Sequence, residues 1–165
     1  MEKSPDQAEA SGWTPEPDVG SGSGGQRLDT IRQRRDALGA AMQALETTVA
    51  RSAAAPGWAG GVGAAIAEVR RALEAHIADV EGPDGLLEEI LDLAPRLAHM
   101  TQEIEDEHDT LLESVIRVEK AVDRDADPRA TRRAVISLLG GLVIHRQRGS
   151  DLIYEAYNVD IGTGY

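Results

Sequence analysis

The feature that most constrains this chain is the spacing of its apolar residues, which recur every three or four positions through four long segments. That spacing matches an α-helix, which has about 3.6 residues per turn, so each segment is expected to form a helix with one apolar face. The expected helices span residues 27–50, 61–80, 95–122 and 128–157. Because no segment alternates with the period of a half-buried strand, the pattern predicts an all-α protein.

The connections between these segments predict an up-down four-helix bundle. Residues 53–63 contain Pro56 and four glycines and are expected to form a loop. A Gly-Pro break follows residue 81, and a short amphipathic piece at 86–94 leads into the third long helix. Asp127 is expected to cap the fourth helix. Connections this short join neighbouring antiparallel helices, as in an up-down bundle.

The chain has 165 residues, which fits one domain. Residues 1–26 are rich in Gly, Ser, Pro and acidic residues and are expected to form a disordered tail, because they cannot bury enough apolar area to offset chain entropy. Trp13 is the one large apolar residue in that segment. The predicted bundle covers residues 27–157, and residues 158–165 are expected to form an extended C-terminal tail.

Charge and composition exclude several function classes. The net charge of −12 repels phosphate backbones, so no nucleic-acid partner is expected. No apolar run is long enough for a membrane span, and no secretory signal is present. The absence of cysteine excludes disulfides and thiolate metal sites and is compatible with a cytoplasmic protein.

Two small basic clusters stand out against this acidic background. One consists of Arg32, Arg34 and Arg35, and the other of Arg146 and Arg148. We interpret both as solvated helix faces, with a local contact to an anion as the alternative.

Three of the four histidines fall at the centre of an apolar helix face. His76, His108 and His145 lie on three successive long helices, whereas His99 lies away from its stripe. A single histidine in such a position is most often a core residue with one hydrogen bond. Three of them indicate a polar cluster, because a buried imidazole is costly unless its nitrogens are satisfied. Imidazole is also the commonest transition-metal ligand in proteins.

The sequence leaves open whether all three histidines share one level of the bundle. Counting outward from the turn near residue 125 places His108 opposite His145, and counting from Pro56 places Arg35 opposite His76. If residues 86–94 continue the direction of the second helix, the two pairs come to one level. If that piece folds across the end of the bundle, His76 lies several turns away from His108.

At these histidines the sequence resembles the hemerythrin-like, or HHE cation-binding, family. The resemblance is carried by residues 76–81, 106–112 and 145–155 and extends over roughly 27–157. It implies a four-helix bundle whose core binds two iron ions through histidines and carboxylates. The candidate metal ligands that it suggests are His76, His108, His145, Glu81 and Asp151, and Glu107, which flanks the buried stripe of the third long helix, is a further candidate.

The ligand set implied by the resemblance is incomplete. Arg35 stands where the family has a first-helix histidine, and Leu112 where it has a second histidine on the third helix. Glu81 and Asp151 each come one residue late, which on a regular helix turns a side chain by about 100°. The sequence therefore does not determine whether these two carboxylates point into the core.

Two functions remain in competition. The first is a hemerythrin-like domain that either binds a metal ion through its core histidines or has lost that ion. The family resemblance implies iron, and a small ligand is a further candidate partner. The second is a helical interaction or structural module in which the histidines and Arg35 form a buried hydrogen-bond network with acidic residues. No nucleophile motif, phosphate-binding loop or paired catalytic carboxylate stands out, so the sequence does not predict an enzyme. The oligomeric state is not determined.

Overall fold

The computed structural model describes residues 23–124 and 127–158. Its helices are α1 (Ser23–Ala50), α2 (Trp58–Glu81), α3 (Leu86–Leu93), α4 (Ala98–Asp123) and α5 (Pro128–Asn158), with one 3₁₀ turn, η1 (Pro95–Leu97), before α4. The described ranges contain no strand, and the all-α prediction is confirmed. None of the helices in these ranges is long and apolar enough to cross a bilayer.

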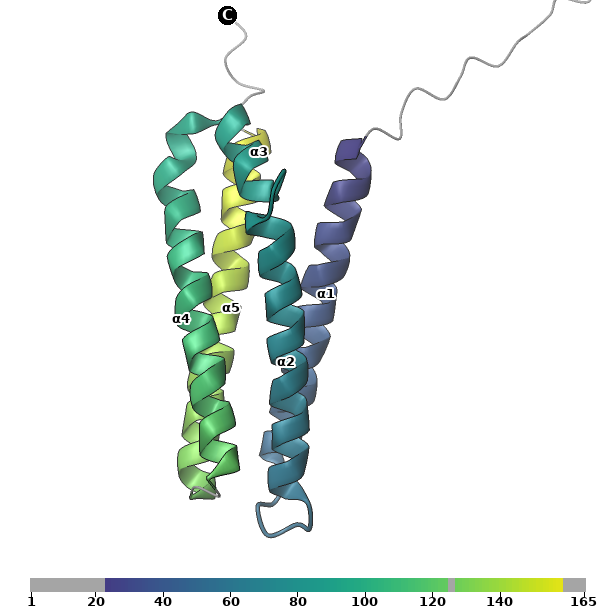
Figure 1. Ribbon diagram of the computed structural model, residues 1–165, viewed down its shortest axis with the longest axis vertical. Coiled ribbons are helices and arrows are strands. Elements are labelled where there is room, and N and C mark those ends of the chain that lie inside the picture. Colours follow the sequence, from purple (N-terminus) through teal and green to yellow (C-terminus); the bar gives the residue numbers. More distant parts are fainter. Residues whose placement is uncertain (1–22, 125–126, 159–165) are drawn as a thin grey trace, which may run out of the picture.

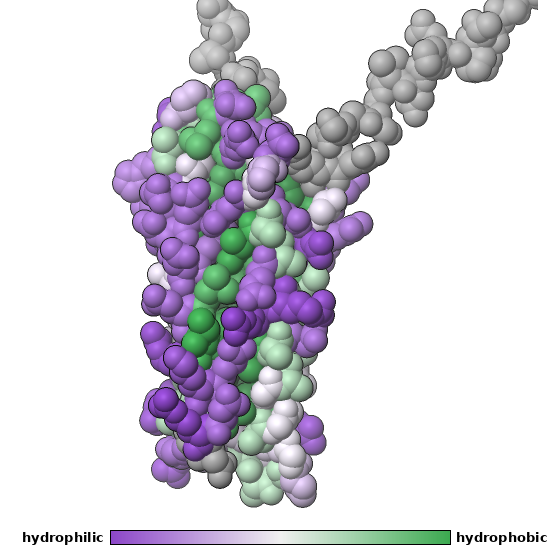
Figure 2. Space-filling model, viewed as in Figure 1, coloured by the Kyte–Doolittle hydropathy of each residue, from purple (hydrophilic) through white to green (hydrophobic). Residues whose placement is uncertain are grey.

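The four long helices run alternately up and down and form a bundle (Figure 1). α1 packs along α2 and α4 along α5, and contacts of α2 with α4 and of α1 with α5 join the two pairs. The face with α2 and α4 in front is mostly hydrophilic, with a narrow hydrophobic band along the seam between them (Figure 2).

The short helix α3 decides the level at which the histidines meet. α2 ends at Glu81 and is followed by Gly82, whose backbone is extended, and Asp84 adopts a positive φ of 55° in the turn beyond it. α3 then lies beyond the end of α2, and η1 leads into the descending α4 (Figure 1). Of the two paths that the sequence left open, the chain takes the one that keeps the second, third and fourth long helices in register.

The core consists of two apolar clusters, one towards each end of the bundle. The larger cluster contains Leu38, Leu73, Leu111 and Leu142. The smaller contains Ile31, Val80, Ile104 and Leu152. On each long helix one polar residue of the buried stripe lies between the two clusters. We call these four residues, Arg35, His76, His108 and His145, the polar layer.

Two predicted boundaries need correction. α2 begins at Trp58, so three glycines of the predicted 53–63 loop are helical. The reason is tertiary: the Trp58 ring is buried in the larger cluster, with the Arg132 guanidinium 5.2 Å from the ring centroid, and this packing outweighs the low helix propensity of glycine. α1 begins at Ser23, four residues before its predicted start. Most of the predicted N-terminal tail, Trp13 included, and the predicted C-terminal tail from residue 159 lie outside the described residues.

The start of α5 follows the sequence prediction. The Asp127 carboxylate accepts a hydrogen bond of 3.1 Å from the backbone N–H of Arg129, and Pro128 is the first helical residue. One turn later, Arg132 donates hydrogen bonds to the carbonyls of Val49 and Arg51 and so joins α5 to the end of α1.

Two glycine substitutions are expected to change stability in opposite directions. Gly57 precedes α2 with a φ of 74°, where a side chain is strained, so Gly57→Ala should destabilise the fold by about 1 kcal/mol. Gly140 lies exposed inside α5 with nothing within 4 Å of an added Cβ, so Gly140→Ala should stabilise it by about 0.5–1 kcal/mol. Urea midpoints measure both changes, and a stabilising Gly57→Ala would contradict the assigned turn.

Candidate metal centre

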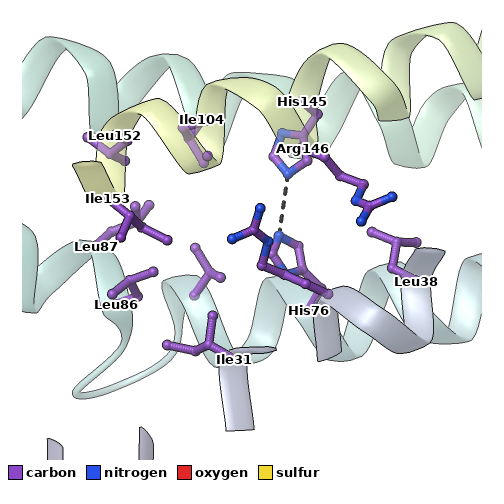
Figure 3. A pocket seen from close by; sticks show the side chains of 13 residues that line it. Ile31, Leu38, His76, Leu86, Leu87, Ile104, His145, Arg146, Leu152 and Ile153 are labelled. Carbon is purple, nitrogen blue, oxygen red and sulfur yellow. Dashed lines mark hydrogen bonds between the residues drawn. The ribbon is translucent and has the colours of Figure 1, made fainter. Parts of the chain in front are cut away.

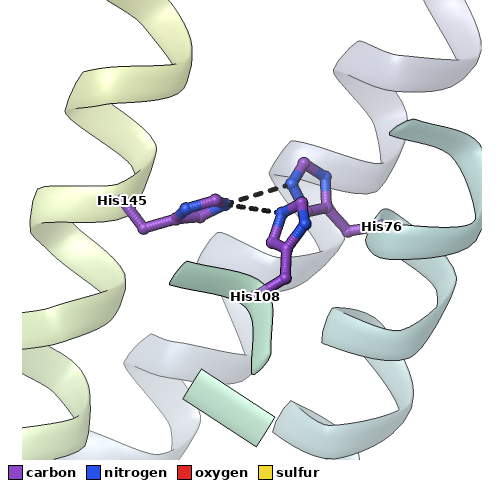
Figure 4. A group of neighbouring side chains, drawn as sticks. All are labelled: His76, His108 and His145. Carbon is purple, nitrogen blue, oxygen red and sulfur yellow. Dashed lines mark hydrogen bonds between the residues drawn. The ribbon is translucent and has the colours of Figure 1, made fainter. Parts of the chain in front are cut away.

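The three core histidines lie together at one level of the bundle (Figure 4). His76 comes from α2, His108 from α4 and His145 from α5, and all three are buried. The Nε2 atoms of His108 and His145 are 3.1 Å apart, and those of His145 and His76 are 3.4 Å apart. One ring nitrogen from each residue lies within 4.8 Å of the other two. A cluster of this kind can hold a metal ion.

The three rings are steeply inclined to one another in edge-on, T-shaped arrangements and are not stacked. Ring centroids are separated by 4.6 Å to 5.6 Å, and the ring planes are inclined by 61° to 83°. The lone pairs of imidazole nitrogens lie in the ring plane, so rings that meet by their edges can direct them to a common point. Such a point is where a shared cation would lie.

Two carboxylates hold the outer nitrogens of this cluster. His108 Nδ1 is hydrogen-bonded to Glu81, and His145 Nδ1 is hydrogen-bonded to Glu107 at 3.0 Å. Glu107 also forms an ion pair with Arg148 at the surface. His76 lacks such a partner, and its Nδ1 is buried without a hydrogen bond.

These carboxylates determine which nitrogen of each ring carries the proton. When Glu81 and Glu107 are ionised they only accept hydrogen bonds, so His108 and His145 then donate from Nδ1, and in a neutral ring the proton is absent from Nε2. Two Nε2 lone pairs consequently face each other at 3.1 Å. His76 can donate one Nε2 proton, which satisfies one of these lone pairs and leaves the other unpaired. A cation or an additional proton between the rings would remove this conflict.

Burial opposes the additional proton. It lowers the pKa of His76 from 6.5 to about 3, with further contributions from His108, His145 and Arg35. It also lowers the pKa of His108 from 6.5 to about 4, with His145 as the next cause. Near neutral pH these two imidazoles are therefore neutral. Burial also raises the pKa of the Glu81 carboxyl, and Asp109 adds to this.

Not every predicted ligand reaches the cluster. Asp151 is exposed and accepts a hydrogen bond of 2.8 Å from Gln147 on its own helix, because the one-residue slip turns it away from the core. Glu81 and Glu107 do reach the histidines, as hydrogen-bond partners behind the rings rather than beside the Nε2 atoms. His99 is exposed, as its position off the stripe predicts.

Arg35 belongs to the polar layer but forms no hydrogen bond with the histidines. Its guanidinium donates to the Ser150 hydroxyl at 2.5 Å. It lines a cavity together with His76 and His145, and burial, followed by the charge of Arg146, lowers its pKa. The sequence did not predict the parts played by Ser150 and Arg146. The only signal for Arg146 was its membership of a basic cluster next to His145.

The residues present do not fit the two-iron centre that the family resemblance implies. A two-iron centre in a helical bundle needs carboxylates directly on the metals, and the one group within the described ranges that could hold a metal ion contains histidines alone. Two ligand positions that the family resemblance implies hold residues that cannot bind a metal ion. Leu112 packs against the apolar core at one of them, and the cationic Arg35 occupies the other. The donor set fits a single ion.

Comparison with known proteins adds no relative. No family model matches the chain, and neither a curated protein nor a solved structure matches it.

The lowered histidine pKa values predict acid sensitivity of the metal-free protein. Unfolded histidines take up protons near pH 6.5, whereas folded His76 and His108 do so only near pH 3 and 4. The unfolded state therefore binds more protons in this window, and stability should fall as the pH drops from about 6.5 towards 4. Urea unfolding at several pH values measures the slope. His76→Leu should flatten it, and His99→Leu, which changes an exposed ring, should not. Equal slopes in all three proteins would contradict the buried neutral state.

Proposed function

We propose that this protein binds one divalent transition-metal ion through the Nε2 atoms of His76, His108 and His145. One observation carries the proposal: two buried imidazoles, each held at Nδ1 by a carboxylate, face each other through Nε2. A divalent cation accepts both lone pairs at once. The third ring completes a set of three neutral nitrogen donors.

Two of the three separations between ring nitrogens agree with those of a metal-bound set, and the third pair, His76 and His108, lies within 4.8 Å. Metal–nitrogen bonds of about 2.0–2.1 Å in a tetrahedral site place two ligand nitrogens about 3.3 Å apart. The two Nε2–Nε2 distances here, 3.1 Å and 3.4 Å, lie on either side of that value. Carboxylates on the outer nitrogen are the usual support of metal-binding histidines, since they fix the ring orientation and make Nε2 a better donor.

Zn²⁺ is the ion that this donor set suits best. Neutral imidazoles suit zinc, copper, iron and nickel, whereas non-haem Fe(II) sites with open positions commonly combine two histidines with a carboxylate. Three protein ligands leave one position of a tetrahedral ion open, as in zinc sites that accept water or a ligand. We assign no reaction to that position.

A groove of about 450 Å³ extends from the surface to His145 and Glu107, on the outer side of the cluster. Glu103, Asp106 and Glu107 line it together with Arg148, so its lining carries a net negative charge that favours the approach of a cation. We regard the chain as a hemerythrin-like bundle with a reduced, single-ion centre; the support is the register of the histidines on α2, α4 and α5 and the up-down topology.

The competing function is a helical module whose polar layer is only a hydrogen-bond network. The Glu81–His108, Glu107–His145 and Arg35–Ser150 hydrogen bonds favour it. In such a module the histidines would contribute to stability without any dependence on metal.

Metal binding separates these two functions. Protein purified without a histidine tag, stripped with a chelator and dialysed against Zn²⁺ should retain about one equivalent by elemental analysis. Its melting temperature should rise with free Zn²⁺ by mass action. His108→Ala and His145→Ala should abolish this rise, and His99→Ala should preserve it. Full-strength binding by His108→Ala, or none by the unaltered protein, would favour the hydrogen-bond module. Parallel dialysis against Fe²⁺ tests the choice of metal.

The carboxylate behind His145 should tune the affinity for the metal. Glu107→Gln removes the charge that holds Nδ1 and should weaken Zn²⁺ binding by about 10-fold to 100-fold. Glu103→Gln is the matched control, because Glu103 lines the same groove and has no hydrogen bond to a core histidine. Competition with a chromophoric chelator measures both affinities. Equal losses in the two variants would reduce the role of Glu107 to general electrostatic attraction.

A further inference from the structure

Two half-buried arginines form no ion pair within the described ranges although the protein carries a net charge of −12, and the one nearby carboxylate that raises the pKa of Arg35, Asp36, is exposed. The half-buried arginines in the described part of the chain are Arg35, Arg70, Arg132 and Arg146. Arg70 pairs with Glu74 and Glu119, and Arg132 donates to backbone carbonyls at the end of α1. Neither Arg35 nor Arg146 forms an ion pair with a carboxylate of the described residues. Both come from the basic clusters for which the sequence offered an anion contact as an alternative.

These two arginines come together from two neighbouring helices, α1 and α5. Arg35 donates to the Ser150 hydroxyl, which in turn donates to the backbone carbonyl of Arg146. The Arg146 guanidinium reaches across to α1 at Gly39, where an added Cβ would be 3.2 Å from Nη1. Glycine at this position leaves the space in which the guanidinium lies.

Both arginines line a cavity of about 30 Å³ beside the histidines. Leu87, Leu152 and Ile153 gather on one side of the His76 and His145 rings, and the Arg146 side chain extends towards Leu38 on the other (Figure 3). The walls of the cavity are otherwise apolar, so charges placed in it are weakly screened by water.

Unsatisfied polar atoms concentrate at this cavity. Within the described ranges, three buried side-chain polar atoms lack a hydrogen-bond partner, and two of them, His76 Nδ1 and Arg146 Nε, belong to residues that line it. The two guanidiniums also repel each other, which contributes to the lowered pKa of Arg35. An internal water would satisfy a nitrogen but would not neutralise two like charges.

We propose that this cavity binds a small planar oxyanion, of the size of formate, nitrite or hydrogencarbonate, between Arg35 and Arg146. The volume corresponds to about two or three waters, which limits the ligand to three or four non-hydrogen atoms. A planar oxyanion matches the fork of guanidinium N–H donors. The apolar walls disfavour ions with larger hydration shells or a higher charge.

The inference does not depend on the proposed metal site. The cavity borders two of the metal-binding histidines, but the groups that hold the anion are the arginines. Anion binding is therefore tested in metal-free protein, where failure of metal binding has no effect on the result.

The probe is sodium formate, titrated into chelator-treated, full-length protein at constant ionic strength made up with sodium chloride. The melting temperature should rise with formate and then level off, and calorimetry should show a single site. Sodium benzoate, a planar carboxylate too large for the cavity, should produce no such rise. Arg35→Gln and Arg146→Gln should each weaken formate binding by about tenfold or more. Arg133→Gln, which removes an exposed arginine of α5, should retain the affinity within about twofold.

A second measurement needs no variant and covers the case in which a substitution prevents folding. In ¹H–¹⁵N spectra of the unaltered protein, formate should shift the Arg146 Nε–H signal and leave that of Arg133 in place. The proposal is overturned if formate and benzoate act alike at matched ionic strength. It is equally overturned if formate binding survives in both cavity variants, or if the Arg146 signal does not respond.

Discussion

Satisfying polar groups inside an apolar bundle is the constraint on which this structure depends. Each long helix contributes one polar residue to a layer between two apolar clusters, so three imidazoles and a guanidinium lie where leucines would pack without cost. Two carboxylates at the edges of the layer bind two of the rings from behind. The inner nitrogens are left facing one another, and a shared cation satisfies them most directly.

This arrangement differs from a two-iron centre in its electrostatics as well as in its ligand count. Carboxylates that lie beside the metal neutralise two cations in a di-iron bundle, whereas here they lie beyond the rings and their charge acts through the imidazoles. Arg35 adds a positive charge at the same level. A single ion on three neutral nitrogens is the arrangement that this charge pattern tolerates.

The two proposed sites complement each other. Arg35 and Arg146 place positive charge beside the histidines, which disfavours a cation there, and an anion between the arginines would offset that effect. Because coupling between two binding sites is reciprocal, a cation on the histidines would strengthen anion binding to the same degree. The ring of His76, whose Nδ1 is buried and unpartnered, belongs to both proposed sites, since its Nε2 would bind the metal ion and its side chain lines the cavity.

The sequence by itself determined the helices, the up-down bundle and the placement of three histidines on buried helix faces, because the spacing of apolar residues specifies which face of each helix is buried. It also predicted the cap at Asp127 and the pairing of His108 with His145. Tertiary structure alone decided the height of His76 along the bundle axis relative to His108 and His145, because that height depends on the path of α3 after Gly82. It also decided that the Glu81 carboxylate reaches His108 whereas Asp151 stays on the surface, and that Arg35 and Arg146 share a cavity. Helix periodicity gives the direction of a side chain from its own axis, but the distance between side chains on different helices depends on loop geometry and packing.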